Sequence, residues 1–301
     1  MRYTVESWAA DYGSSSEPVM RDASEPPRLD VELPVGRWTP ITPSSRGADV
    51  VVFIDGVRRV DANIWIERSD DLPVLGLCAV YAAGAVLADG AAATMVESSV
   101  DRGLFTSALD AEDLETRNGT YRAHLSEGET AEELWLSIQS QMGRQEGEIA
   151  RRFSGQLVIV DGPLSHGSHP DGVVGYIKRQ YTNYLPPELR RVLLDLPTGR
   201  RTPLFLIGGR SNRYSWYQRL AVMGGPGGGI VRCETSATMS VSDAVALADQ
   251  VAATLPRYAS EPHKDGRAPQ NLYPIAGLER SLRARLGDPR LMERALRLAS
   301  V

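Results

Sequence analysis

The chain has few of the residues that build metal or redox sites from sulfur and imidazole. Its 301 residues include two cysteines, Cys78 and Cys233, in apolar or strand-like surroundings. The sequence therefore predicts buried thiols and excludes a disulfide framework or a thiolate metal site. The four histidines do not form a zinc pattern, and the two in the loop after residue 161 are expected to be exposed to solvent. The histidines are His124, His166, His169 and His263.

Long hydrophobic runs are also missing. The longest candidate, residues 72–87, is interrupted by Gly76 and Gly84 and falls short of the ~20 apolar residues of a membrane span. The N-terminus lacks the apolar segment of a secretory signal. We therefore expect a cytoplasmic protein that makes no membrane contact.

Lysine is scarce, since Lys178 and Lys264 are the only two among 33 basic residues. A lysine directly after a strand suggests a compact charge placed near phosphate, although chance would give the same placement. The net charge is −5, but residues 1–143 carry 11 basic and 24 acidic residues (net −13), whereas residues 144–219 carry 12 and 6 (net +6). This distribution suits an enzyme acting on a polyanion, and an ordinary solvated face would look the same.

Two apolar strands that end in Asp-Gly organise the remaining sequence. Residues 50–56 run Val-Val-Val-Phe-Ile-Asp-Gly, and residues 157–162 run Leu-Val-Ile-Val-Asp-Gly. Each pattern predicts a buried strand that presents one carboxylate, Asp55 or Asp161, at its end. Two carboxylates brought together in one sheet repel each other unless a cation or a proton lies between them.

A third acid is expected on a helix. Residues 130–133, Thr-Ala-Glu-Glu, have the spacing of a capping box, and the apolar residues that follow share one side of a helix. Glu146 lies near the edge of that apolar side, whereas Glu148 points away from it, so Glu146 is the better candidate. An acid at such an edge more often reaches water than binds a ligand.

The other expected elements complete an α/β domain that spans residues 48–301. Residues 1–47 are rich in proline and predict an extended N-terminal arm that wraps the core or meets a partner. Residues 213–219 combine aromatic and basic side chains, which suits base stacking as well as an interface or a core. The remaining expectations are a hairpin partner strand at 58–66, strands at 72–89, 92–100, 173–177, 204–208 and 230–235, and helices at 186–196, 243–255 (capped by Ser242), 278–286 and 291–298.

Seven short motifs follow one another along residues 48–290. They are Phe-Ile-Asp55-Gly, Val-Ile-Val-Asp161-Gly-Pro-Leu, Val174-Gly-Tyr-Ile-Lys178, Arg201-Thr-Pro-Leu-Phe205, Ser215-Trp-Tyr217 with Arg219, Arg267-Ala-Pro-Gln-Asn-Leu-Tyr-Pro274 and Leu278-Glu279-Arg280. In content and order these motifs resemble those of the NurA nuclease family, most closely its bacterial branch.

The resemblance implies an RNase H-like mixed sheet flanked by helices and a nuclease that acts on DNA ends with Mn²⁺ or Mg²⁺. It also implies a homodimer that works with HerA, a hexameric DNA translocase, in DNA end processing or defence. Carried over to this chain, it places Asp55, Asp161 and Glu146 at two metal ions and adds Glu279 as a further ligand. Lys178 and Tyr217 would lie near the scissile phosphate. The chain has Val57 where the family often has serine, which removes a hydrogen-bond donor.

Three readings of the function follow from the sequence. The first is a deoxyribonuclease in which two divalent ions activate water and stabilise the leaving 3′ oxygen. The second is a catalytically silent adaptor that keeps the scaffold and docks on an ATPase. The third is an α/β hydrolytic enzyme unrelated to nucleic acids.

Overall fold

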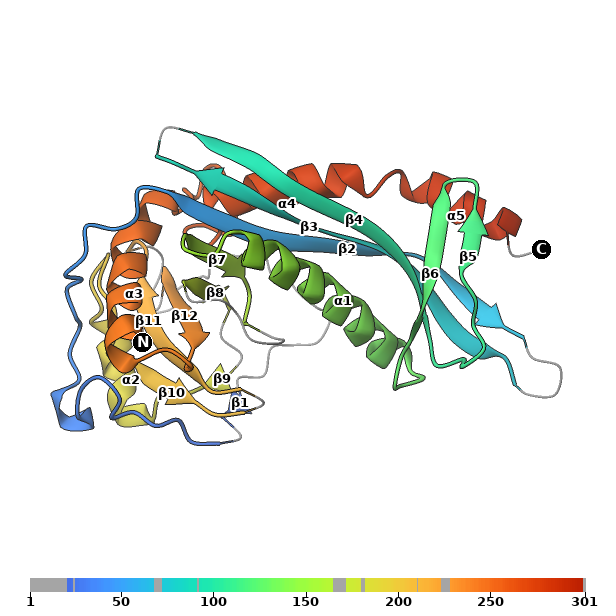
Figure 1. The fold of residues 1–301 in the computed structure, drawn as a ribbon. Helices are drawn as coiled ribbons and strands as arrows, with labels where there is room; N and C mark the ends of the chain where they lie inside the picture. The colour runs from blue at the N-terminus through green and yellow to red at the C-terminus, as the bar shows by residue number, and fades with distance from the viewer. Residues whose placement is uncertain are drawn as a thin grey trace. The chain divides into compact units, whose positions relative to one another are not determined.

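The computed structural model describes residues 21–23, 25–67, 72–90, 92–164, 172–179, 182–209, 211–222 and 228–299 (Figure 1). His166 and His169 lie outside these residues, as do residues 1–20 and 24 of the expected N-terminal arm. The helices are η1 (Val35–Arg37), α1 (Ala131–Arg152), α2 (Pro187–Leu194), α3 (Val241–Thr254), η2 (Leu255–Tyr258), α4 (Tyr273–Arg285) and α5 (Pro289–Ala299). The strands are β1 (Arg21–Asp22), β2 (Val51–Ile66), β3 (Val74–Ala88), β4 (Ala93–Thr106), β5 (Leu114–Thr116), β6 (Gly119–Leu125), β7 (Leu157–Asp161), β8 (Val173–Ile177), β9 (Thr182–Asn183), β10 (Phe205–Ile207), β11 (Arg213–Arg219) and β12 (Ile230–Ser236).

The fold class is α/β, with a large mixed sheet flanked by helices, as the sequence predicts. The strand order is β10-β11-β12-β8-β7-β2-β3-β4-β6-β5, and β1 pairs separately with β9. The sheet is mixed because β7 and β8 are parallel, whereas β8, β12, β11 and β10 pair antiparallel in turn. No helix among the described residues is long and apolar enough to cross a membrane.

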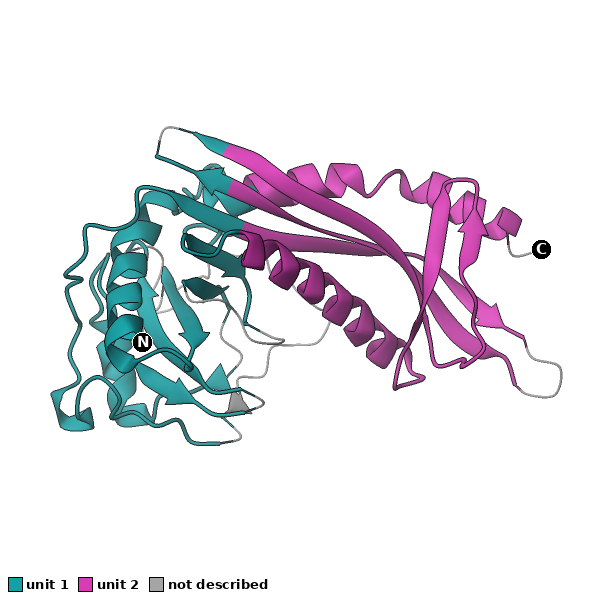
Figure 2. Ribbon diagram, in the orientation of Figure 1, with its two compact units in different colours: residues 1–53, 87–93, 153–276 teal, residues 54–86, 94–152, 277–301 magenta. Residues whose placement is uncertain are grey.

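The chain divides into two compact units (Figure 2). Unit 1 contains residues 1–53, 87–93 and 153–276, and unit 2 contains residues 54–86, 94–152 and 277–301. This division differs from the boundary expected after residue 47, because strand β2 begins in unit 1 and continues into unit 2. Each unit therefore takes its sheet and its helices from distant parts of the sequence.

The predicted hairpin after Asp55 is wrong, because β2 runs without a turn from Val51 to Ile66. The same dipeptide behaves differently in the two strands. Gly162, after Asp161, has a φ of +102°, which only glycine adopts readily, and the chain turns there. Gly56 is not among the glycines with positive φ and remains part of the strand. An Asp-Gly pair alone therefore does not show whether a strand ends.

In unit 2, helices cover both faces of β3. Alternate side chains of a strand point to opposite faces, so a strand covered on both sides is apolar throughout. Leu77, Ala79 and Tyr81 pack against apolar residues of α1, and Val80 and Ala82 pack against apolar residues of α4. Figure 1 shows these two helices on opposite sides of β2–β4. The long apolar run of β3 is thereby explained.

In unit 1 the same alternation buries the aromatic residues of β11. Trp216 belongs to the core that contains α3, whereas Tyr217 belongs to a second core with Phe205 and α2. Residues 214–219 are all buried. Of the alternatives that the sequence left open for 213–219, the structure shows a core, because these aromatic side chains pack in the interior on both faces of the strand.

Two smaller expectations have clear outcomes. Cys78 and Cys233 are free and buried, as predicted. Burial raises the pKa of the Cys78 thiol to about 12, and a thiol that stays protonated is a poor nucleophile. The predicted cap of α3 is wrong by two residues, since the Ser240 hydroxyl, and not Ser242, accepts the hydrogen bond from the Asp243 amide.

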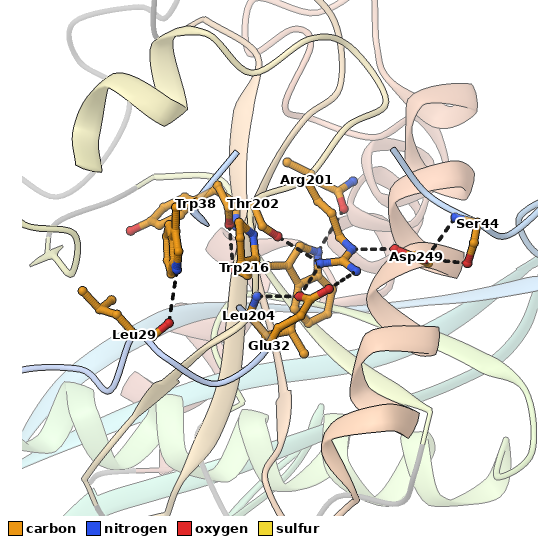
Figure 3. Close-up of polar contacts among 12 residues, drawn as sticks. Leu29, Glu32, Trp38, Ser44, Arg201, Thr202, Leu204, Trp216 and Asp249 are labelled. Atoms are coloured by element: carbon orange, nitrogen blue, oxygen red, sulfur yellow. Dashed lines mark hydrogen bonds and ion pairs between the residues drawn. The ribbon is translucent and has the colours of Figure 1, made fainter. Parts of the chain in front are cut away.

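The described part of the N-terminal segment is held to unit 1 by Arg201 (Figure 3). This guanidinium is 1% exposed and donates to Glu32 at 2.8 and 2.9 Å and to Asp249 at 2.7 Å. Asp249 also accepts from the Ser44 hydroxyl at 2.7 Å and from its amide at 3.0 Å. Trp38 is buried, and its indole donates to the Leu29 carbonyl. Residues 29–44 thus lie along unit 1 and are fixed to it by Trp38 and these hydrogen bonds, in keeping with an arm that wraps the core.

Candidate active site

A first group of candidate site residues lies on β2, in unit 2. Asp55 is a buried carboxylate, 8% exposed, that accepts a hydrogen bond from the Gly56 amide at 2.8 Å. Burying an ionised carboxylate is costly without compensating partners. Asp55 therefore has the properties of a functional acid held in a nearly dry part of the sheet.

Glu146 reaches this point of β2 from α1. A side chain added at Gly56 would place its Cβ 2.6 Å from Glu146 Oε1, which means that the carboxylate occupies the space that glycine leaves empty. Glu146 is half-buried, whereas Glu148 is exposed. Of the two helix acids weighed from the sequence, Glu146 is the one that the structure places against β2, at Gly56, the residue after Asp55. We refer to Asp55 and Glu146 as the acid pair.

Arg58, on the same strand, belongs to the surroundings of the acid pair. Its guanidinium lies 4.7 Å from the centre of the Trp135 ring and donates to Gln139 at 2.9 Å. Burial lowers the pKa of Arg58, and the charges of Glu146 and Asp55 oppose this effect. An arginine remains protonated despite such a shift, so a fixed positive charge accompanies the two carboxylates.

A second group of candidate site residues lies in unit 1, where Asp161 ends β7 as predicted. Lys178, directly after β8, donates to Asp161 Oδ2 at 2.5 Å and to Asn271 Oδ1 at 2.9 Å. Asn271 in turn donates through Nδ2 to Asp265 Oδ2 at 2.6 Å. We call these four residues the lysine network. The structure thus joins two predicted residues, Asp161 and Lys178, through a direct ion pair.

Asn271 and Asp265 were not predicted as site residues. Asn271 is 0% exposed, although its side chain is polar. Burial acts to raise the pKa of Asp265, but hydrogen bonds from Asn271 and Arg267 and the charge of Arg267 outweigh it and hold the pKa below its ordinary value. The sequence signal was present, because Asn271 lies in the motif at 267–274, but the motif gave no indication of what the amide contacts.

The chain after Asp161 is fixed by buried charges. Glu234 is 0% exposed and accepts from the Leu164 amide at 2.9 Å. Arg213 donates to the Leu164 carbonyl at 2.6 Å, and Arg232 forms an ion pair with Glu234 at 2.6 Å. These contacts hold the residues that follow the turn at Gly162, and they give the basic residues of β11 and β12 a structural role.

Tyr217 is buried in a core and is not part of the candidate site. It is 2% exposed and its ring stacks on Phe205 with centroids 5.7 Å apart. Burial raises the pKa of its hydroxyl to about 12. A ring enclosed in this core presents no surface to a phosphodiester, so we do not retain Tyr217 in the site.

The structure also shows what surrounds two further positions that the motif resemblance singled out, Glu279 and Val57. Glu279, on α4, forms an ion pair with Arg283 one turn along the helix at 2.8 Å. Val57 is 5% exposed and packs in a core cluster with Leu278 and Leu282 of α4. The side chain at position 57 therefore packs against a helix, and the missing serine is replaced by an apolar contact.

The donor chemistry of the acid pair suits a hard divalent cation. Within the described ranges, no three His, Cys, Asp or Glu side chains are gathered so as to hold a metal ion. Mg²⁺ does not require such a cluster, because it commonly binds through one or two carboxylates, water and substrate phosphate. Asp55 and Glu146, which contacts the next residue of β2, are both oxygen donors, the ligand type that this mode of binding uses.

No family model matches the sequence, and no curated protein matches it. Among solved structures, the chain is similar to the crystal structure of the NurA nuclease from Sulfolobus solfataricus. The two share 10% sequence identity with a TM-score of 0.49, and the match covers 83% of this chain and 84% of that one.

Proposed function

We propose that this protein is a metal-dependent deoxyribonuclease that hydrolyses phosphodiester bonds at DNA ends. The observation that carries the proposal is that Glu146 fills the space above Gly56, the residue that follows the buried Asp55 in β2. The charges of both carboxylates act on Arg58, which lies on the same strand. Asp161 and Lys178 add a third acid and a cation.

Each residue has a distinct role in the proposal. Asp55, Glu146 and Asp161 are each proposed as an oxygen ligand for Mn²⁺ or Mg²⁺, with two ions as the expected number. The ions would supply activation of water and stabilisation of the leaving oxygen. Lys178 contributes a point charge for a phosphate oxygen. Glu279 remains a candidate further ligand, although in the structure it pairs with Arg283.

Substitution of the acids tests this proposal. We expect Asp55→Asn, Glu146→Gln and Asp161→Asn to abolish cleavage of 5′- and 3′-labelled DNA in the presence of Mn²⁺. Glu148→Gln is the matched control, because this exposed acid lies on the same helix and should retain full activity. Wild-type cleavage by Asp55→Asn or Asp161→Asn would refute the assignment.

A catalytically silent adaptor is the second candidate, and the ion pair between Asp161 and Lys178 favours it, since that acid already has a cation. Calorimetric titration with Mn²⁺ separates the two functions. The nuclease should bind the ion and lose binding in Glu146→Gln, whereas the adaptor should show no binding at the acid pair.

We further propose that the protein acts as a homodimer with a HerA-type hexameric ATPase that delivers the DNA. The net charge of −5 supports this, because an acidic protein gains little affinity from the phosphate backbone. The isolated protein should bind DNA weakly and cleave it faster with the ATPase and ATP. Tight DNA binding at physiological salt by the protein alone would contradict this part of the proposal.

A further inference from the structure

We infer that Asn271 is a positioning residue that holds the Lys178 ammonium in place, and that Asp265 fixes the orientation of the Asn271 amide. The contacts are internal to unit 1 and run from Asp265 through Asn271 to Lys178 and Asp161. The effect of these contacts on DNA cleavage rests on the proposed function. The positioning of Lys178 by Asn271 does not depend on that function.

The orientation of the amide follows from the chemistry of its two neighbours. An ionised carboxylate only accepts hydrogen bonds and an ammonium only donates them. Asn271 therefore directs Nδ2 to Asp265, at 2.6 Å, and Oδ1 to Lys178, at 2.9 Å. The reverse orientation would place donor against donor and acceptor against acceptor. Because the residue is 0% exposed, no water can replace either partner without a rearrangement.

Asp265 is itself held in position. The Arg267 amide donates to its Oδ1 at 2.8 Å, and the Arg267 side chain forms an ion pair with the same oxygen at 3.3 Å. One carboxylate oxygen thus binds Arg267 and the other binds Asn271. The charge of Asp265 is partly neutralised by Arg267, so that its main effect on Lys178 is transmitted through the amide.

A neutral acceptor has a particular advantage at this place. Asp161 neutralises the ammonium, and an acid at position 271 would do so twice. An amide fixes the position of the ammonium without cancelling its charge, which leaves that charge to attract phosphate. When Asp161 engages a cation instead, Asn271 still holds the lysine. Asn271 therefore keeps the Lys178 ammonium in place whether or not that ammonium is paired with Asp161.

The scarcity of lysine permits a direct test. The chain contains only Lys178 and Lys264, and Lys264 is half exposed, so a protein labelled at lysine Cε and Nζ gives one site signal and one internal reference. We compare NMR spectra of the full chain, without added metal, for the wild type, Asn271→Leu and Asp265→Asn. Asn271→Leu removes both amide contacts with little change in volume. Asp265→Asn leaves Asn271 in place and provides a second test of the Lys178 signal if Asn271→Leu does not fold.

The expected result is a shifted Lys178 signal in Asn271→Leu, with the Lys264 signal unchanged, and a smaller Lys178 shift in Asp265→Asn. In DNA cleavage assays, we expect kcat to fall about 10- to 100-fold in Asn271→Leu, the range typical of residues that orient a site group, with a smaller change in KM. A Lys178 signal that matches the wild type in every folded variant would overturn the inference. If the wild type cleaves no DNA, the proposed function fails while the shifted Lys178 signal still supports the positioning role.

Discussion

Gly56 sets how closely α1 approaches β2. Its missing side chain leaves room for Glu146 Oε1 and Met142 Cγ, which lie 2.6 and 2.7 Å from where a Cβ would stand. We expect Gly56→Ala to displace both side chains and to lower the free energy of unfolding by about 1–3 kcal/mol, the usual range for overpacking. Urea denaturation measures this cost, and the nuclease assay should show a loss of activity because Glu146 moves.

Gly277 provides the matched control. It lies inside α4, and a Cβ there would meet no atom within 4 Å. Gly277→Ala should raise the unfolding free energy by about 0.5–1 kcal/mol, since alanine favours the helix. Equal behaviour of the two variants would show that Gly56 is not under steric constraint.

His124 makes the folded state sensitive to acid. Its ring stacks on Phe105 with centroids 4.8 Å apart. Burial and then the charge of Arg144 lower its pKa, with Arg122 adding to the effect and Asp113 and Asp101 opposing it. The unfolded chain therefore binds more protons than the folded chain at pH values from about 6.5 down to the lowered pKa, so stability is lost as the pH falls through this window.

The substitution His124→Phe should flatten this dependence, because phenylalanine keeps a stacking ring and cannot be protonated. The measurement is the unfolding free energy between about pH 7.5 and pH 5 for both proteins. His263→Phe is the control, since His263 is exposed and should leave the profile unchanged. A parallel pH profile for wild type and His124→Phe would assign the acid sensitivity to other groups.

At the scale of elements, helix α3 tests the role of its N-terminal cap. The Ser240 hydroxyl accepts from the Asp243 amide at 3.1 Å, one of the amides that a helix leaves unpaired. Ser240→Ala should therefore lower the unfolding free energy by about 1 kcal/mol. Ser242→Ala should change it little, because this residue lies within the first turn. The opposite order in thermal or chemical denaturation would restore the cap expected from the sequence.

Local signals predicted some elements well. Helix α1 begins with the expected capping box, in which Glu133 accepts from the Thr130 amide and the Thr130 hydroxyl accepts from the Glu133 amide. β7 ends at Asp161, and Pro187 opens α2. These features depend on residues within a few positions of one another. The continuation of β2 through Gly56 depends instead on α1, about 90 positions along the chain, and no local pattern contains that information.

In the candidate site too, residues marked by local patterns were predictable, whereas those defined by distant contacts were not. Asp55 lies within β2, Asp161 ends β7 and Lys178 directly follows β8, and their positions could be inferred from apolar runs. Tyr217 was misplaced, because an aromatic residue in a strand looks the same whether it faces a substrate or a core. Asn271 was missed because a buried amide acquires meaning only from its partners, Lys178 and Asp265.

At the scale of the molecule, the N-terminal segment also shows that contacts between distant residues cannot be predicted from local sequence. The proline-rich composition of residues 1–47 predicted an extended arm, but the contact that holds it joins Glu32 to Arg201, which are 169 positions apart. The pair forms only when the chain is folded, and because it is buried, each charge is costly to leave without the other. The described part of the arm is consequently a component of unit 1 and should unfold with it.

Removal of Arg201 tests this dependence. Arg201→Leu leaves Glu32 and Asp249 without their shared cation and should lower the unfolding free energy by about 3–5 kcal/mol, the usual cost of breaking a buried pair. The Ser44 amide, which donates to Asp249, should also lose protection from hydrogen exchange. Arg200→Leu, at the half-buried neighbouring position, should cost less than about 1 kcal/mol. If Arg201→Leu costs no more than this control and Ser44 stays protected, the arm is held by its apolar contacts at Trp38 instead.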